Sequence, residues 1–358
     1  MERKRSRLIL GIAVLLAGAA LIIALPALLA LPEEVRFAME LTPGWNLANA
    51  LDAHGLGAGA GAPSVYETYW GAEPISAPML NAIAKAGFRT VRLPVTWFEH
   101  MDASGNIDPA WMTRVQTVVD GALAAGLCVI VNAHHDPWYQ PTPDNLSKAE
   151  ATLRIVWRQI AEHFADYDDR LLFEGMNEPR LLGAESEWIG GTPEARDGLN
   201  RLNDAFVQTV RGSGGHNSTR YLLLPTYAAS VREDALGSFA ATADARIMVS
   251  VHLYAPYDFA LNASGTAAWS LASAADTKEI RDAFHSLYWL FVRKGIPVVI
   301  TEFGAMEKHN TEARAAWATF VTQLAKQAHI PYVWWDTSLL DQRALTWRYP
   351  QLVEVLVH

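Results

Sequence analysis

Along most of the chain, short apolar runs alternate with longer stretches whose apolar positions recur at helical spacing. The expected strands lie near residues 39–45, 88–95, 127–133, 171–176, 220–225, 246–252, 297–302 and 330–335. The expected helices between them include residues 110–125, 148–165, 193–210, 277–293 and 311–327. Buried strands that alternate with helices are typical of parallel βα units. Eight units in about 320 residues predict an α/β fold, a (β/α)8 TIM barrel, in preference to an open doubly wound sheet.

Residues too polar for a core follow nearly every expected strand on its C-terminal side. They are Arg92, Asn132, His134, His135, Asp136, Asn177, Glu178, His252, Tyr254, Glu302, Trp335 and Asp336. In a (β/α)8 barrel the C-terminal ends of the strands carry the active site. The pattern therefore predicts one site built from at least six strands.

Two glutamates stand out, because each ends an apolar, β-prone run and is followed at once by a helix breaker. Glu178 precedes a proline, and Glu302 lies in the run that ends at Gly304. A carboxylate at the end of a buried strand costs desolvation energy. Two converging carboxylates are the minimum for hydrolysing a glycosidic bond with one acid and one nucleophile or base. The structural alternatives are a helix-start residue for Glu178 and an ion pair with Arg92 for Glu302.

The N-terminus differs from the rest of the chain. Four basic residues within positions 1–7 precede 24 residues without a charge, positions 8–31. At 1.5 Å per residue this run is long enough to cross a bilayer of about 30 Å. We predict an uncleaved signal-anchor helix in residues 1–35 and a catalytic domain in residues 36–358. A cleaved signal peptide is the alternative, and either one places the domain outside the cytoplasm, membrane-anchored or secreted.

Composition narrows the possible partners. The net charge is −9 and no basic stripe is visible, which argues against nucleic acid. The single cysteine excludes an intramolecular disulfide. The histidines at the strand ends are candidate metal ligands, but no His-x-His marks the first strand and no strand-end lysine accompanies them. We expect no metal, no cofactor and a monomer.

Seven motifs, in order along the chain, resemble glycoside hydrolase family 5, a large family of endoglucanases and related β-glycanases. They are Gly44-Trp45-Asn46-Leu47-Ala48-Asn49, Val91-Arg92-Leu93-Pro94-Val95, Asn132-Ala133-His134-His135, Asn177-Glu178-Pro179, His252-Leu253-Tyr254, Thr301-Glu302-Phe303-Gly304 and Trp334-Trp335-Asp336. Residues 226–230 and 254–257 are similar to the subfamily of broad endo-β-1,4-glucanases that includes xyloglucanases.

This resemblance implies a retaining mechanism. Glu178 would be the general acid and then the base, and Glu302 the nucleophile. In the family, the residues that match Arg92 and Tyr254 bond the nucleophile. The remaining matches would contact sugar: Asn177 the 2-hydroxyl, His134 and His252 sugar hydroxyls or the acid, Trp335 the ring face, and Asn49, Trp70, His135 and Trp138 more distant subsites.

The expected substrate is a β-glucan: a cellulose-like, mixed-linkage or xyloglucan polysaccharide. A β-mannanase on the same scaffold and a non-catalytic glycan-binding barrel are the alternatives. Ala48 and Ala72 depart from the residues usual in the family's motifs. Both lie away from the expected scissile bond, so they concern side-chain preference rather than the reaction.

Overall fold

The computed structural model describes residues 31–240, 244–335 and 339–358. Eight parallel strands close into a barrel, in which β1 pairs with both β2 and β8. The strands are β1 Gly44–Asn46, β2 Thr90–Leu93, β3 Cys128–Asn132, β4 Leu171–Glu174, β5 Leu222–Pro225, β6 Ile247–Leu253, β7 Val298–Phe303 and β8 Tyr332–Trp335. The predicted (β/α)8 barrel is confirmed, and the alternative of an open sheet is wrong.

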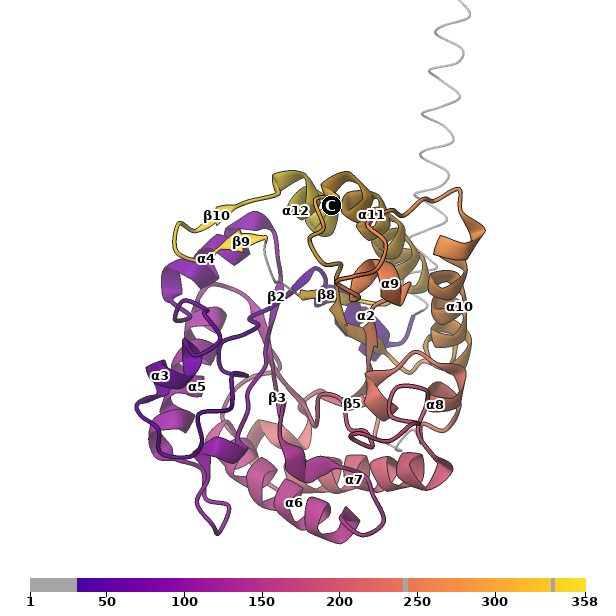
Figure 1. Ribbon diagram of the computed structural model, residues 1–358. Helices are drawn as coiled ribbons and strands as arrows, with labels where there is room; N and C mark the ends of the chain where they lie inside the picture. The colour runs from indigo at the N-terminus through magenta and orange to yellow at the C-terminus, as the bar shows by residue number, and fades with distance from the viewer. Residues whose placement is uncertain (1–30, 241–243, 336–338) are drawn as a thin grey trace, which may run out of the picture.

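Helices surround the strands (Figure 1). They are α2 Glu33–Glu40, α3 Pro63–Glu67, α4 Ala77–Ala86, α5 Pro109–Ala124, α6 Leu146–His163, α7 Pro193–Arg211, α8 Glu233–Gly237, α9 Tyr257–Ala260, α10 Ala274–Leu290, α11 Thr311–Ala328 and α12 Pro350–Val357. The five helices expected from periodicity correspond to α5, α6, α7, α10 and α11, with ends shifted by a few residues. Capping explains two of the starts: the side chains of Asp108 and Thr192 accept backbone N–H groups of α5 and α7.

The first expected strand, near 39–45, is largely wrong. Residues up to 40 belong to α2, and β1 begins only at Gly44. Ala38 and Leu41 pack against the apolar interior of the barrel, and Phe37 stacks on Tyr221 at 4.0 Å between ring centroids. The expected strand therefore begins in the end of a short helix that closes the barrel at the N-terminal ends of its strands, and it is a strand only from Gly44 onward.

Alternation along the strands places polar groups inside the barrel near their C-terminal ends. Ile130 and Leu172 belong to the interior cluster that α2 covers. Because strand residues two apart face the same side, Asn132 and Glu174 continue these inward rows. Arg92 is in register with Ile130 and also points inward. The interior thus changes from apolar at one mouth to polar at the other, where the site lies.

The predicted anchor, residues 8–31, lies outside the described residues except for Leu31, as does Asp336. Among the described residues, no helix combines the length and apolarity needed to cross a membrane.

Candidate active site

The two predicted carboxylates meet at the C-terminal ends of β4 and β7. Glu178 follows β4 by four residues, and Glu302 lies within β7. An oxygen of each lies within 4.8 Å of the other and of a nitrogen of His252. Retaining glycosidases separate their carboxyl groups by about 5–5.5 Å, and inverting ones by about 6.5–9.5 Å. The close approach of the two carboxylates favours a retaining pair.

Glu302 reaches the barrel interior because β7 carries an extra residue. Ile300 pairs with Val251 of β6, whereas the next pair is Glu302 with His252, so Thr301 has no partner there. The register with β8 shifts over the same residues. Such a bulge re-aims side chains. It allows both Thr301, which contacts Ser250 at 2.7 Å, and Glu302 to face inward.

The Glu302 carboxylate accepts two strong hydrogen bonds. Nη1 of Arg92 donates to Oε1 at 2.7 Å, and the Tyr254 hydroxyl donates to Oε2 at 2.9 Å. Burial raises the pKa of Glu302, while His252 and Arg92 oppose this rise by favouring the charged form. Both partners were predicted from the resemblance, and the structure brings both to this carboxylate.

Glu178 shares its proton with His252. Nδ1 of His252 is hydrogen-bonded to Oε1 of Glu178 at 2.8 Å. Burial acts to raise the pKa of Glu178, but the hydrogen bond and charge of His252 outweigh burial and lower it. Burial acts to lower the pKa of His252, but Glu302 and Glu178 raise it. The resting proton therefore lies toward the imidazole, one hydrogen bond from the carboxylate that would donate it.

Arg92 lies at the centre of a fully buried polar cluster. Besides Glu302, its guanidinium donates to Glu174 at 2.7 Å, Asn177 at 2.7 Å and Asn46 at 3.1 Å. Sequence analysis found Arg92 and Asn177 but assigned no role to Glu174 or Asn46. The available signal was alternation: both are polar residues at inward-facing positions of apolar strands.

His134 and Trp335 form one wall of the site, with rings parallel within 8° and centroids 5.6 Å apart. Burial, with smaller effects from neighbouring cationic groups, lowers the pKa of His134 well below its usual value, so this imidazole is neutral. Trp335 is partly exposed at the end of β8. The arrangement gives a flat aromatic surface beside a neutral hydrogen-bonding group, as a sugar ring requires.

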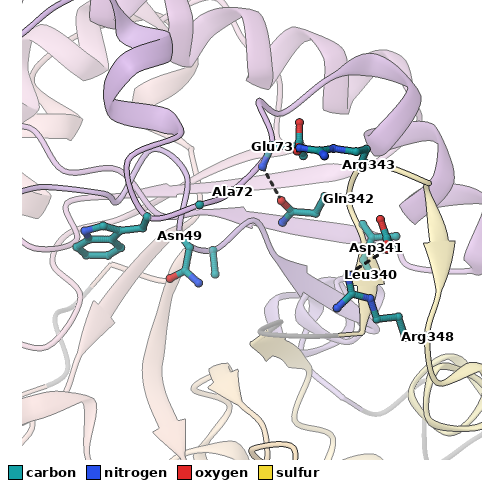
Figure 2. Close-up of a pocket in the computed structure, with 11 residues that line it drawn as sticks. Asn49, Ala72, Glu73, Leu340, Asp341, Gln342, Arg343 and Arg348 are labelled. Atoms are coloured by element: carbon teal, nitrogen blue, oxygen red, sulfur yellow. Dashed lines mark hydrogen bonds and ion pairs between the residues drawn. The ribbon is translucent and has the colours of Figure 1, made fainter.

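A polar cavity of about 420 Å3 lies beyond β1, against a hairpin that sequence analysis missed (Figure 2). Asn49 and Trp70 line it, as does the hairpin of β9 Leu340–Asp341 and β10 Thr346–Trp347. The backbone N–H of Glu73 donates to Gln342 at 2.9 Å, which ties the hairpin to the loop before α4. Asn49 and Trp70, two of the residues predicted for distant subsites, thus line one cavity.

His135 and Trp138, the other predicted distant contacts, have different surroundings. His135 lines a second cavity, of about 290 Å3, which also borders Glu178 and Arg180. Its ring centroid lies 5.6 Å from that of Trp70, so the two cavities are neighbours. Trp138 packs against Tyr139 and the core and lines neither cavity.

Two groups of potential metal ligands occur among the described residues. One is Glu178, His252 and Glu302, and the other is Asp52, His134 and His135. In the second group the Asp52 carboxylate already accepts the backbone N–H groups of residues 49 and 50 at 3.1 and 2.8 Å. In the first group, Glu178 is hydrogen-bonded to His252, and Glu302 accepts hydrogen bonds from Arg92 and Tyr254.

Comparison with known proteins places this site in a family. The family model for cellulase (glycosyl hydrolase family 5) matches residues 52–339. Endoglucanase A of Clostridium longisporum is 37% identical over 365 residues, which cover 96% of this chain and 71% of that protein.

Solved structures agree with this placement. A broad-specificity endoglucanase of subfamily GH5-4 from Clostridium longisporum superposes with a TM-score of 0.87 at 37% identity, covering 92% of this chain and 98% of that one. A second one, from Ruminococcus champanellensis with bound cellotriose, gives 0.85 at 39% identity, covering 90% and 98%. The chain belongs to glycoside hydrolase family 5, the cellulase family, and is a glycoside hydrolase.

Proposed function

We propose that this hydrolase is a retaining endo-β-1,4-glucanase, with Glu178 as general acid and base and Glu302 as nucleophile. The observation that carries the proposal is the pair of carboxylate oxygens within 4.8 Å of each other, with His252 beside both. An inverting enzyme needs room for a water between substrate and base, which requires a wider spacing.

In the first step, Glu302 attacks the anomeric carbon while the glycosidic bond breaks and the leaving oxygen takes a proton from Glu178. Arg92 and Tyr254 hold the two oxygens of Glu302, so the attacking carboxylate is oriented before substrate binds. His252 returns the shared proton to Glu178 as the leaving group departs, because the two groups are already hydrogen-bonded.

In the second step, a water attacks the glycosyl ester and gives its proton to Glu178. Ester formation removes the negative charge of Glu302, while Glu178 is a carboxylate. When Glu178 takes the proton from water, its own negative charge is lost. This loss lowers the proton affinity of Glu302, so Glu302 leaves as a carboxylate. Glu178 then passes this proton back to His252 along their hydrogen bond, so both glutamates and the imidazole return to their starting ionisation states.

Three further residues support binding of the sugar at the cleavage point. Asn177, held by Arg92 at 2.7 Å, is placed to bond the 2-hydroxyl. Neutral His134 offers a hydrogen bond to another hydroxyl, and the ring stacks on Trp335.

The proposed substrates are cellulose-like, mixed-linkage and xyloglucan polysaccharides. One cavity is lined by Asn49 and Trp70 (Figure 2), and a second cavity, lined by His135, borders Glu178. Room for several sugar units supports cleavage within a chain.

We further propose that residues 1–35 are an export segment, anchored or cleaved, and that residues 36–358 act outside the cytoplasm. The basic flank and the uncharged run of residues 8–31 support this proposal.

The test uses the full chain in mild detergent with carboxymethylcellulose, barley β-glucan, xyloglucan and galactomannan, and measures reducing ends. We expect release from one or more glucans, loss of release in Glu302→Gln, and normal release in Glu312→Gln, an exposed change on α11. Release from galactomannan alone would replace the substrate with mannan. Folded but inactive protein on all four substrates would contradict the proposal.

A further inference from the structure

Glu174 is a buried carboxylate that the mechanism above does not use. It is the last residue of β4, and its side chain has no exposed surface. A buried charge persists only where partners stabilise it. Its position inside the barrel, four residues before Glu178, raises the question of what it stabilises in turn.

Both oxygens of Glu174 accept hydrogen bonds from other strands. Oε2 accepts from Nε of Arg92 at 2.7 Å and from Nδ2 of Asn132 at 3.0 Å. Oε1 accepts from the Ser250 hydroxyl at 2.5 Å. The carboxylate therefore joins β2, β3 and β6 at the level just inside the catalytic pair.

Glu174 fixes the direction of Arg92. The guanidinium is planar, so a bond to Nε at one edge determines where the other two nitrogens point. With Nε on Glu174, Nη1 meets Glu302 at 2.7 Å and Nη2 meets Asn177 at 2.7 Å. The single positive charge of Arg92 is thereby divided between two carboxylates. Arg92 therefore stabilises the charged form of Glu302 less than it would if Glu302 were its only carboxylate partner.

Glu174 also fixes the protonation of His134 through Asn132. The backbone N–H of Val95 donates to Oδ1 of Asn132 at 3.2 Å. Because the Glu174 carboxylate can only accept, the Asn132 atom that faces it must be the Nδ2 donor. The amide orientation is thus determined, and Nδ2 also lies 3.1 Å from Nδ1 of His134. Nδ1 of this neutral ring must accept, so Nε2 carries the proton and is the only donor of the ring.

We propose that Glu174 is a positioning residue. It orients Arg92, weakens the effect of the Arg92 charge on Glu302, and determines the tautomer of His134. The assignment rests on the proposed roles of Glu178 and Glu302. The charged and titratable groups that face Glu302 are Arg92 from β2, Glu178 after β4, His252 from β6, Tyr254 just after β6, and Asp52 after β1. Among these groups, Glu174 contacts Arg92.

The test is Glu174→Gln, which removes the charge and keeps the shape. The glutamine oxygen accepts from Arg92 and Asn132, and its NH2 group donates to the Ser250 hydroxyl, which then turns toward Thr301. We expect a folded protein with kcat lowered about tenfold, because an uncompensated Arg92 makes Glu302 a weaker nucleophile.

The decisive readout is the pH dependence of inactivation by 2,4-dinitrophenyl 2-deoxy-2-fluoro-β-cellobioside. Glu302 forms a bond to the anomeric carbon, and dinitrophenolate leaves with the electron pair without help from an acid. The acidic limb therefore reports ionisation of Glu302 alone. In Glu174→Gln we expect this limb about one unit lower in pH than in the wild type. An unmoved limb in a folded variant would overturn the proposal, since a merely structural role changes only stability.

Two outcomes separate this proposal from the proposed function. A wild type that is not labelled at Glu302 would overturn the function and this assignment together, whereas labelling with an unmoved limb overturns the assignment alone. If Glu174→Gln does not fold, Glu174→Asp keeps the charge but draws it back by one methylene from Nε of Arg92, which lies 2.7 Å from the wild-type carboxylate. We then expect the limb to move to lower pH, and an unmoved limb overturns the proposal.

Discussion

Nδ1 of His252 lies 2.8 Å from Oε1 of Glu178, in a hydrogen bond that joins the two groups into one titrating pair. The pKa of His252 is raised and that of Glu178 lowered. The pair therefore holds one proton until the pH rises through the raised imidazole value. An enzyme that needs this proton loses activity in the same pH range.

Replacing His252 by glutamine should move the alkaline limb of kcat/KM to lower pH. Glu178 then holds the proton as a carboxylic acid, which loses it at lower pH than the imidazole pair does. The measurement is the pH profile on barley β-glucan. His285→Gln, an exposed change on α10, serves as the control. A limb that stays or moves upward would contradict the shared-proton account.

Glu178→Gln should lower activity on glucan by about 100- to 10,000-fold, the usual contribution of general acid catalysis. The same variant should keep most of its glycosylation rate on dinitrophenyl cellobioside, because that leaving group needs no proton. Rates on the two substrates give the comparison. Full activity on glucan would show that another group is the acid.

Tyr254→Phe should lower kcat about tenfold with little change in KM. It removes the 2.9 Å hydrogen bond to Oε2 of Glu302, so the carboxylate is held by Arg92 alone and is free to rotate. Steady-state kinetics on carboxymethylcellulose measure the changes in kcat and in KM separately. Tyr257→Phe is the matched control, because Tyr257 is 61% exposed at the start of α9. Equal losses in both variants would refute a specific role.

The sequence predicted seven of the eight barrel strands and most of the polar residues at their C-terminal ends, because both depend on local pattern. Runs of apolar residues indicated strands, and the residues that follow them indicated the site. The role of Glu174 could not be predicted in this way. The role of Glu174 depends on its contacts with Arg92, 82 positions earlier in the chain, and with the amide of Asn132.

Elements without a regular pattern were also missed. β9 and β10 contain two residues each, too few for any periodicity. The expected strand near 39–45 began too early and took in the last two residues of helix α2, which covers the end of the barrel. The bulge that turns Glu302 inward leaves no sequence signal, since it is a shift in pairing between neighbouring strands.

Trp70→Ala should lower kcat/KM on barley β-glucan about tenfold, or about 1.4 kcal/mol, and leave short aryl cellobiosides nearly unaffected. Trp70 is 38% exposed and lines the 420 Å3 cavity, and its ring packs near His54 and His135. A polymer reaches this cavity, whereas a substrate with two sugar units occupies mainly the site beside Trp335.

The matched control is Trp289→Ala on α10, because Trp289 is 44% exposed and lines neither cavity of the site. Product sizes after partial digestion provide a second readout, since loss of a distant subsite changes where the chain is cut. Equal losses on polymer and short substrate would place the effect of Trp70 at the cleavage point instead. A loss in Trp289→Ala as large as that in Trp70→Ala would attribute both to a general effect of removing exposed tryptophan.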